Sequence, residues 1–278
     1  MIEYLKVKFP YMFNIIKNIY KMTGYYKSKQ FKRKEFYDLR TEEIKTRQKT
    51  LIDEYFQGKA TVRGGPFKGM KYIEISHGSQ LLPKLLGSYE EPIHKWVENV
   101  IKKRYRVIVD IGCAEGYYAI GFALKIPEAT VYAYDTNEEA IKMLETMAKM
   151  NQVDGRIKVG AFCDHKELNE ICSINTLVFC DIEGDERELL DPIKVPNIIN
   201  ADLIIESHDF FRPGTTELLI GRFSKTHKIS IVVDYSRDRE KYISTLDNKP
   251  SDNDLDMIFD EIRAGQAKYL FCKAFKVE

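Results

Sequence analysis

Short apolar runs alternate with helical patterns from Arg106 to the C-terminus. The runs are RVIVD, ATVYAYD, IKVGAFCD, NTLVFCD, ADLIIESHD, KISIVVDYS and YLFCKAFKV. Several of them are apolar at consecutive positions, as in strands of a sheet that is covered by helices on both faces. Residues 105–278 are therefore predicted to form one Rossmann-like α/β domain with a doubly wound, mostly parallel sheet.

Two further segments precede this domain. Residues 1–58 are polar and helical in pattern, and they predict a basic, aromatic-rich extension. Residues 59–104 begin with two short alternating runs around a glycine- and proline-rich turn, ATVRGGPFKGMKYIEIS, which predicts a hairpin. In EPIHKWVENVIKK the apolar residues recur at i, i+3, i+4, i+7 and i+8, which predicts a helix with one apolar face.

Charge is distributed unevenly along the chain. Residues 1–35 hold nine Lys and Arg against two Glu, a balance of +7, which leaves −6 for the rest of a chain whose net charge is +1. The basic, aromatic start is compatible with an anionic membrane surface or an acidic partner. A solvated helical extension is the favoured interpretation. Because the remainder is acidic and offers no basic cleft, nucleic acid is not expected as a substrate.

No long apolar run resembles a signal peptide or a membrane-spanning helix, so a cytoplasmic protein is expected. The five cysteines form no CxxC pair and lie mostly in apolar runs, which indicates buried, reduced thiols. The oligomeric state is left open by the sequence.

Acidic residues end the first strand candidates one after another. The first four runs end at Asp110, Asp135, Asp164 and Asp181, and the fifth ends in Glu206-Ser207-His208-Asp209. In open parallel sheets the ligand crevice lies at the carboxyl ends of the strands. These acids are therefore expected to meet in one cleft.

The turn after the first run, DIGCAEG, is rich in glycine. Gly112 and Gly116 allow a sharp turn and a close approach to a ligand before a helix begins. A nicotinamide site requires GxGxxG and offers its amides to a pyrophosphate. Here Tyr117 takes the last glycine position, and Glu115 would repel a phosphate. S-adenosylmethionine (SAM), which carries a sulfonium and an ammonium, suits these acids better.

The other acids fit a nucleoside. Asp135 lies 19 residues after Gly116, close to the spacing at which an acid binds both ribose hydroxyls. Asp164 is placed to meet the adenine amino group. Either residue could instead cap the following helix. The predicted cofactor-binding residues are Asp110, Gly112, Cys113, Ala114, Glu115, Gly116, Asp135, Thr136 and Asp164.

The stretch from about Gly87 to the C-terminus resembles class I SAM-dependent methyltransferases. The resemblance rests on IVDIGCAEG, on the acid at Asp135 and on the last two runs, which would supply that family's terminal antiparallel strands. CDIEGDERELL and IIESHDFFRPG are similar to the FkbM-type branch and related bacterial enzymes, which implies methylation of hydroxyls on sugars or secondary metabolites. Ala114 departs from the family pattern, which commonly has a glycine there.

The residues expected to act on the acceptor follow the fourth and fifth runs. Transfer to oxygen requires removal of a proton, and the chain lacks the Asn/Asp-Pro-Pro-aromatic signature of amino-nitrogen methylation. His208 is predicted as the general base, oriented by Asp181 or Glu206, which share its side of the cleft. A hydrogen-bonded structural histidine is nearly as well supported. A divalent metal held by these three residues is compatible with the pattern but is not favoured.

Three functions therefore remain after the sequence is read. The first is a SAM-dependent O-methyltransferase, with S-adenosyl-L-homocysteine (SAH) as product and a sugar, glycan or other small hydroxyl compound as acceptor. The second is a nicotinamide-dependent oxidoreductase. The third is a non-catalytic nucleoside-binding module with the same fold.

Overall fold

The computed structural model describes residues 24–263 and 265–275. Contacts divide the chain into two units, residues 1–48 and residues 49–278. The helix α3 begins at Gly24 and ends at Tyr55, which agrees with the helical prediction over that range. The predicted basic segment, residues 1–35, lies outside the residues whose side chains are described. On the described surface of the first unit, Arg40 pairs with Glu43 and Lys45 with Glu42.

The second unit is built on a seven-stranded sheet with the order β3-β2-β1-β4-β5-β7-β6. Strands β1 to β5 are parallel, whereas β7 is antiparallel to both β5 and β6. The predicted α/β fold with antiparallel terminal strands is confirmed. The strands are β1 (Val107–Ile111), β2 (Thr130–Tyr134), β3 (Ile157–Gly160), β4 (Thr176–Cys180), β5 (Asp202–Ser207), β6 (His227–Val233) and β7 (Lys268–Ala274).

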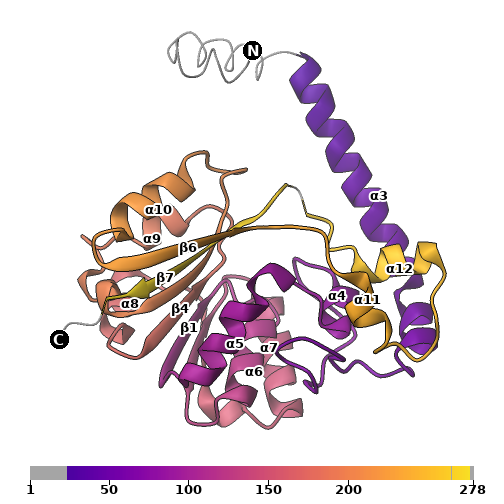
Figure 1. Ribbon diagram of the computed structural model, residues 1–278, viewed down its shortest axis with the longest axis horizontal. Helices are drawn as coiled ribbons and strands as arrows, with labels where there is room; N and C mark the ends of the chain where they lie inside the picture. Colours follow the sequence, from indigo (N-terminus) through magenta and orange to yellow (C-terminus); the bar gives the residue numbers. More distant parts are fainter. Residues whose placement is uncertain (1–23, 264, 276–278) are drawn as a thin grey trace. The chain divides into compact units, whose positions relative to one another are not determined.

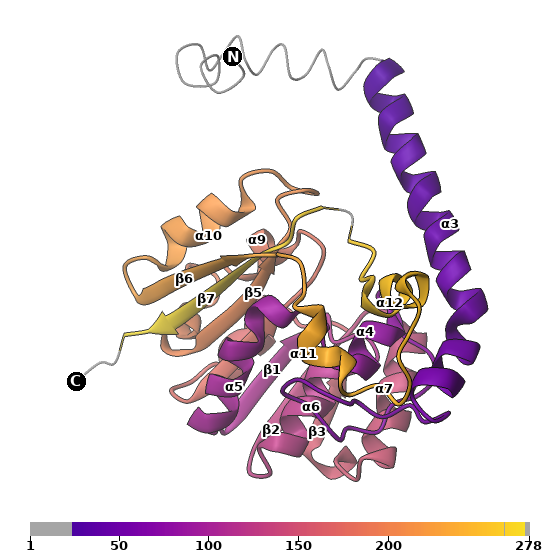
Figure 2. The same cartoon turned by 45° about the vertical axis from the view of Figure 1, so that its right-hand side comes forward.

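Helices cover both faces of this sheet (Figures 1 and 2). On one face lie α5 (His94–Lys103), α6 (Tyr117–Lys125) and α7 (Glu138–Met150), and on the other lie α8 (His165–Ile171), α9 (Glu186–Leu189) and α10 (Thr215–Phe223). Val109, Val178 and Leu203 of the central strands pack with Leu168 and Leu219 in one buried cluster. Since the central strands are apolar on both faces, the helices must cover them from both sides.

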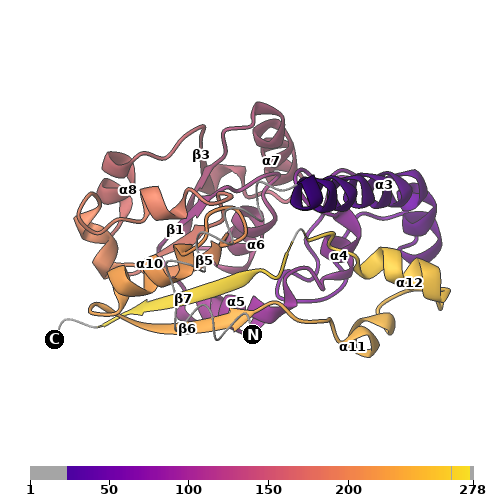
Figure 3. The same ribbon diagram turned by 90° about the horizontal axis from the view of Figure 1, so that it is seen from above.

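A smaller group of helices joins two distant parts of the second unit. Short α4 (Leu81–Leu86) precedes the sheet in sequence, whereas α11 (Arg239–Ile243) and α12 (Asp252–Phe259) lie between β6 and β7. Helix α12 packs against α4, and Tyr55 at the end of α3 donates a hydrogen bond to Asp254 at 2.9 Å. Figure 3 shows α11 and α12 beyond the end of the paired strands β6 and β7.

The connections contain three 3-10 turns, η1 (Glu91–Ile93), η2 (Asp154–Arg156) and η3 (Pro196–Asn200). The predicted hairpin in residues 59–76 is reduced to one antiparallel bridge between Thr61 and Lys71. Phe67 from this segment instead packs its ring against Tyr117 and Phe122 of α6. Tertiary burial of an aromatic side chain therefore takes precedence over regular strand pairing. In the described part of the chain, no helix is both long and apolar enough to cross a bilayer.

Candidate functional site

The glycine-rich turn joins β1 to α6 and runs very close to the neighbouring strand. Gly112 has φ +83°, and a Cβ atom there would lie 1.7 Å from the carbonyl oxygen of Asp181. Only glycine fits this approach. Gly116 (φ +96°) ends the turn, and Ala114 also adopts a left-handed conformation with φ +46°. The turn therefore brings backbone amides to the carboxyl edge of the sheet.

Asp135, directly after β2, lies between this turn and the start of α7. Its Oδ2 accepts a hydrogen bond from the Ala114 amide at 2.8 Å, and its Oδ1 accepts one from the Asn137 amide at 2.8 Å. Asn137, rather than Asp135, caps α7 by accepting from Glu139 and Ala140. The capping alternative for Asp135 is therefore not the arrangement found, and its carboxylate lines the central cavity.

Asp110, on β1, lies beneath the turn with only 2% of its surface exposed. Its Oδ2 has no hydrogen-bond partner among the described residues. Burial and the nearby charge of Asp181 raise the pKa of Asp110 to about 8. Asp110 also lines the cavity, so a ligand cation would compensate its charge.

Glu115 lies elsewhere than expected. Its buried carboxylate accepts hydrogen bonds from Lys84 at 2.5 Å, Tyr72 at 2.5 Å and Ser76 at 2.7 Å. Burial raises the pKa of Glu115, but the Lys84 charge and the hydrogen bonds from Lys84, Tyr72 and Ser76 together outweigh burial, so the pKa is lowered. Neither Glu115 nor Gly116 belongs to the cavity lining, so the structure does not bring them to a ligand. The sequence argument that Glu115 repels a pyrophosphate therefore loses its basis.

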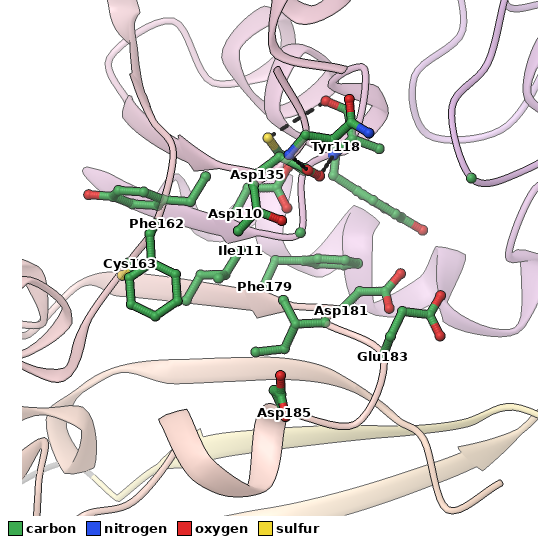
Figure 4. A pocket seen from close by; sticks show the side chains of 18 of the residues that line it. Asp110, Ile111, Tyr118, Asp135, Phe162, Cys163, Phe179, Asp181, Glu183 and Asp185 are labelled. Atoms are coloured by element: carbon green, nitrogen blue, oxygen red, sulfur yellow. Dashed lines mark hydrogen bonds between the residues drawn. The ribbon is translucent and has the colours of Figure 1, made fainter. Parts of the chain in front are cut away.

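The cavity has a volume of about 730 Å³, within the range of small-molecule sites, roughly 300–1,000 Å³. Figure 4 shows Asp110 and Asp135 close together, with Phe162 and Cys163 to one side of them and Asp181 to the other. Of the predicted cofactor residues, those that line it are Asp110, Gly112, Cys113, Ala114, Asp135, Thr136 and Asp164. Asp164 also caps α8 by accepting from the Glu167 amide at 2.8 Å, as its structural alternative predicted.

The three predicted acceptor-side residues come together at the ends of β4 and β5. One ligand-capable atom from each of Asp181, Glu206 and His208 lies within 4.8 Å of the other two. The His208 Nε2 atom is 3.4 Å from Asp181 Oδ1 and 4.0 Å from Glu206 Oε1. Asp181 lines the cavity, whereas Glu206 and His208 are not among the lining residues. Asp209 points elsewhere and pairs with Lys268 at 2.9 Å, as strand alternation requires.

Glu186 and Glu183 complete the surroundings of His208. The His208 Nδ1 atom lies 2.7 Å from Oε1 of the fully buried Glu186, and Nε2 lies 3.6 Å from Glu183. Burial lowers the pKa of His208, but the hydrogen bond to Glu186 and the charges of Asp181 and Glu206 outweigh burial and raise it to about 9. His208 is therefore protonated at neutral pH when no ligand is present.

Arg263 was not foreseen as part of this site. The guanidinium group contacts Glu206 at 2.8 Å and Glu90 at 2.9 Å. Tyr118 donates a hydrogen bond to the other oxygen of Glu90. Arg263 belongs to the segment between β6 and β7, far in sequence from its partners, so no local pattern indicates this contact. Glu186 and Glu183, by contrast, stand in the DIEGDE motif and could have been considered from the sequence.

Comparison with known proteins adds one family match. Residues 94–173, which contain β1 to β3 and the glycine-rich turn, match the model described as methyltransferase small domain. A putative O-methyltransferase from Klebsiella pneumoniae is similar with 11% identity and a TM-score of 0.45, over 64% of this chain and 76% of that one. An rRNA methylase from Streptococcus thermophilus is similar with 13% identity and a TM-score of 0.44, over 66% and 97%.

Proposed function

We propose that the chain is a SAM-dependent methyltransferase that methylates a hydroxyl group of a sugar, glycan or other small metabolite. The observation that carries the proposal is a single cavity with two chemically distinct ends. At one end Asp110 and Asp135 lie beside the glycine-rich turn. At the other lies Asp181, and close to it are Glu206 and His208, which do not line the cavity. The methyltransferase match over residues 94–173 supports the same reaction class.

The charges of the cofactor end favour SAM over a dinucleotide. Asp110 and Asp135 line the cavity, and the carboxylate of Asp135 would repel a pyrophosphate. Glu115 no longer contributes to this argument, because it pairs with Lys84 and does not itself line the cavity. The sulfonium and ammonium groups of SAM would instead be attracted, and a bound cation would favour the charged form of Asp110. In this proposal Asp135 binds the ribose hydroxyls, and Asp164 with Phe162 contacts the adenine.

The acceptor end suits oxygen chemistry. Methyl transfer from SAM is an in-line displacement, so the protein must align the acceptor, exclude water and receive the proton that the hydroxyl loses. The sequence predicts His208 as the base, but its raised pKa makes it a cation at neutral pH. We therefore assign proton acceptance to the carboxylate of Asp181, which faces the cavity. The His208 cation then stabilises the charge of that carboxylate.

Calorimetric titration separates the three candidate functions. The purified chain is expected to bind SAH and not NAD. Binding of NAD alone would identify the oxidoreductase, and binding of neither ligand would support a non-catalytic module. Isotope-labelled SAM and a set of hydroxyl and amine acceptors would then test whether the methyl group is transferred to oxygen or to nitrogen. We expect label only on hydroxyls, whereas methylation of the amines alone would contradict the oxygen-directed proposal.

A further inference from the structure

We propose that Asp181, Glu206 and His208 form a binding site for a divalent cation, with Mn²⁺ as the best-matched ion. The proposal rests on the proposed function for its role in methyl transfer, but the binding itself does not. The three residues come from the ends of two neighbouring parallel strands. Their ligand-capable atoms lie within 4.8 Å of one another, close enough to contact one ion.

The orientation of His208 is the first supporting observation. Glu186 Oε1 lies 2.7 Å from Nδ1, and the same oxygen accepts the amides of Ile182 and Gly184, each at 3.1 Å. Metal-binding histidines are commonly held in this way, with one ring nitrogen fixed by a carboxylate and the other facing the metal. Here Nε2 is the nitrogen left to face Asp181 and Glu206, and an ion bound there would replace the proton that His208 carries without the ion.

Charge is the second, independent observation. Four carboxylates lie within 4.0 Å of the His208 ring nitrogens: Asp181, Glu183, Glu186 and Glu206. Among the described residues, the one other cation that pairs with any of these four carboxylates is Arg263, which contacts Glu206. Arg263 also pairs with Glu90 and Glu261, so its charge is divided among several carboxylates. Glu186 is fully buried, yet its Oε2 has no partner among the described residues. Glu183 is exposed to solvent, but the side chains of Asp181, Glu186 and Glu206 are partly or fully buried, and a divalent cation would compensate their negative charge.

The available oxygens are consistent with ligation. Arg263 binds Oε1 of Glu206 at 2.8 Å, and within the described residues no hydrogen bond reaches Oε2. The side chain of Asp181 likewise accepts no hydrogen bond there, while it faces the cavity. Two carboxylates with one imidazole form a mixed oxygen and nitrogen set. Carboxylates suit Mg²⁺, Ca²⁺ and Mn²⁺, whereas imidazole favours transition metals, so the set as a whole favours Mn²⁺.

The cation would add a specific step to the proposed reaction. A hydroxyl oxygen of the acceptor would bind the ion, which lowers the pKa of that hydroxyl. Its proton would pass to the carboxylate oxygen of Asp181 that the ion does not use. The resulting oxygen nucleophile would take the methyl group from the sulfonium, leaving neutral SAH. Acceptors with two adjacent hydroxyls would be favoured, because both oxygens could reach one ion.

The test is Mn²⁺ binding to the full chain after treatment with a chelator, followed by electron paramagnetic resonance without acceptor or SAM. We expect one tightly bound Mn²⁺ per chain, and at least about ten-fold weaker binding in Asp181→Asn and His208→Ala. Glu186→Gln, which touches the ion only through His208, should weaken binding about 10- to 100-fold. Asp185→Asn, which removes one cavity charge outside the cluster, should leave binding unchanged.

SAH titration of every variant keeps the two proposals apart and reports on folding. Retained SAH binding with no bound Mn²⁺ in the wild type would overturn the metal site and leave the methyltransferase proposal standing. Tight Mn²⁺ binding without SAH binding would support the metal site and overturn the methyltransferase proposal. Mn²⁺ binding that persists in Asp181→Asn and His208→Ala would also overturn this site, whether or not a variant is less stable.

Discussion

The backbone amide of Ala114 donates a hydrogen bond to Oδ2 of Asp135 at 2.8 Å, which ties the glycine-rich turn to the end of the second strand. This one contact joins the two sequence features on which the cofactor prediction rests. It also means that Asp135 shapes the turn in addition to lining the cavity. Effects of substitution at Asp135 must therefore be separated into ligand contact and turn geometry.

Asp135→Ala should weaken SAH binding by about 1.5–3 kcal/mol, the scale for hydrogen bonds to a charged group, or roughly ten- to a hundred-fold. Calorimetry measures this directly. Asp135→Asn is the matched control, since it keeps one oxygen that can accept from Ala114, and it should bind SAH with intermediate affinity. Equal affinity of the Ala variant and the wild type would remove Asp135 from the cofactor site.

Substitutions at two positions of the glycine-rich turn, Gly112 and Ala114, should have opposite effects on the stability of the protein. Gly112→Ala should destabilise the protein by at least about 2 kcal/mol, because its Cβ would overlap the Asp181 carbonyl. Ala114→Gly should be neutral or stabilising by up to about 1 kcal/mol, since glycine relieves the left-handed conformation at φ +46°. Urea unfolding measures both. A clear loss of stability in Ala114→Gly would contradict this account.

The raised pKa of Asp110 leads us to expect that cofactor binding releases a proton. Burial and the charge of Asp181 raise its pKa to about 8, with smaller contributions from Asp135 and Glu90, so Asp110 is mostly protonated at pH 7. A bound ammonium would stabilise the carboxylate and lower that pKa. SAH binding at pH 7 should therefore release close to one proton, and less as the pH rises above about 8.

Calorimetry in buffers of different ionisation enthalpy counts these protons. Asp110→Asn should abolish the release, while Asp164→Asn, which changes another cavity carboxylate, should retain it. An undiminished release in Asp110→Asn would assign the proton to a different group.

The sequence predicted the sheet and the position of the cleft well. Consecutive apolar positions in the central strands and acids at their ends are local signals, and the structure brings Asp110, Asp135 and Asp181 to one cavity. The partners of individual side chains, by contrast, could not be predicted from the sequence. Glu115 is adjacent to the turn in sequence, yet it pairs with Lys84, and the Arg263–Glu206 contact spans 57 residues. Such choices depend on tertiary packing, which no local pattern encodes.

The raised pKa of His208 also depends on tertiary packing and could not be predicted from the sequence. The sequence indicates an ordinary histidine, and therefore a base active near pH 6–7. The fold places four carboxylates around its ring, from two different strand ends and the start of α9. Their combined effect on the pKa of His208 depends on the topology, which places β5 beside β4.

The buried pair of Lys84 and Glu115 gives the last prediction, which concerns stability. The side chains are 3% and 0% exposed, and they lie 2.5 Å apart. Glu115→Gln leaves the Lys84 charge buried without its partner and should cost about 3–5 kcal/mol at pH 7. The double variant Lys84→Met/Glu115→Gln removes both charges and should cost clearly less than Glu115→Gln alone.

The same pair should make the free energy of unfolding depend on pH in the acidic range. Burial raises the pKa of Glu115, but Lys84 and the hydrogen bonds from Tyr72 and Ser76 lower it below its ordinary value of 4.5. A carboxylate with a depressed pKa in the folded state stabilises the fold above the unfolded-state value, and this contribution disappears as the pH falls through the folded-state value. The difference in unfolding free energy between the wild type and Glu115→Gln should therefore be constant near neutral pH and shrink below about pH 4. A difference that stays the same at pH 3 would mean that Glu115 is not ionised in the folded protein, and the buried ion pair would have to be abandoned in favour of neutral hydrogen bonding.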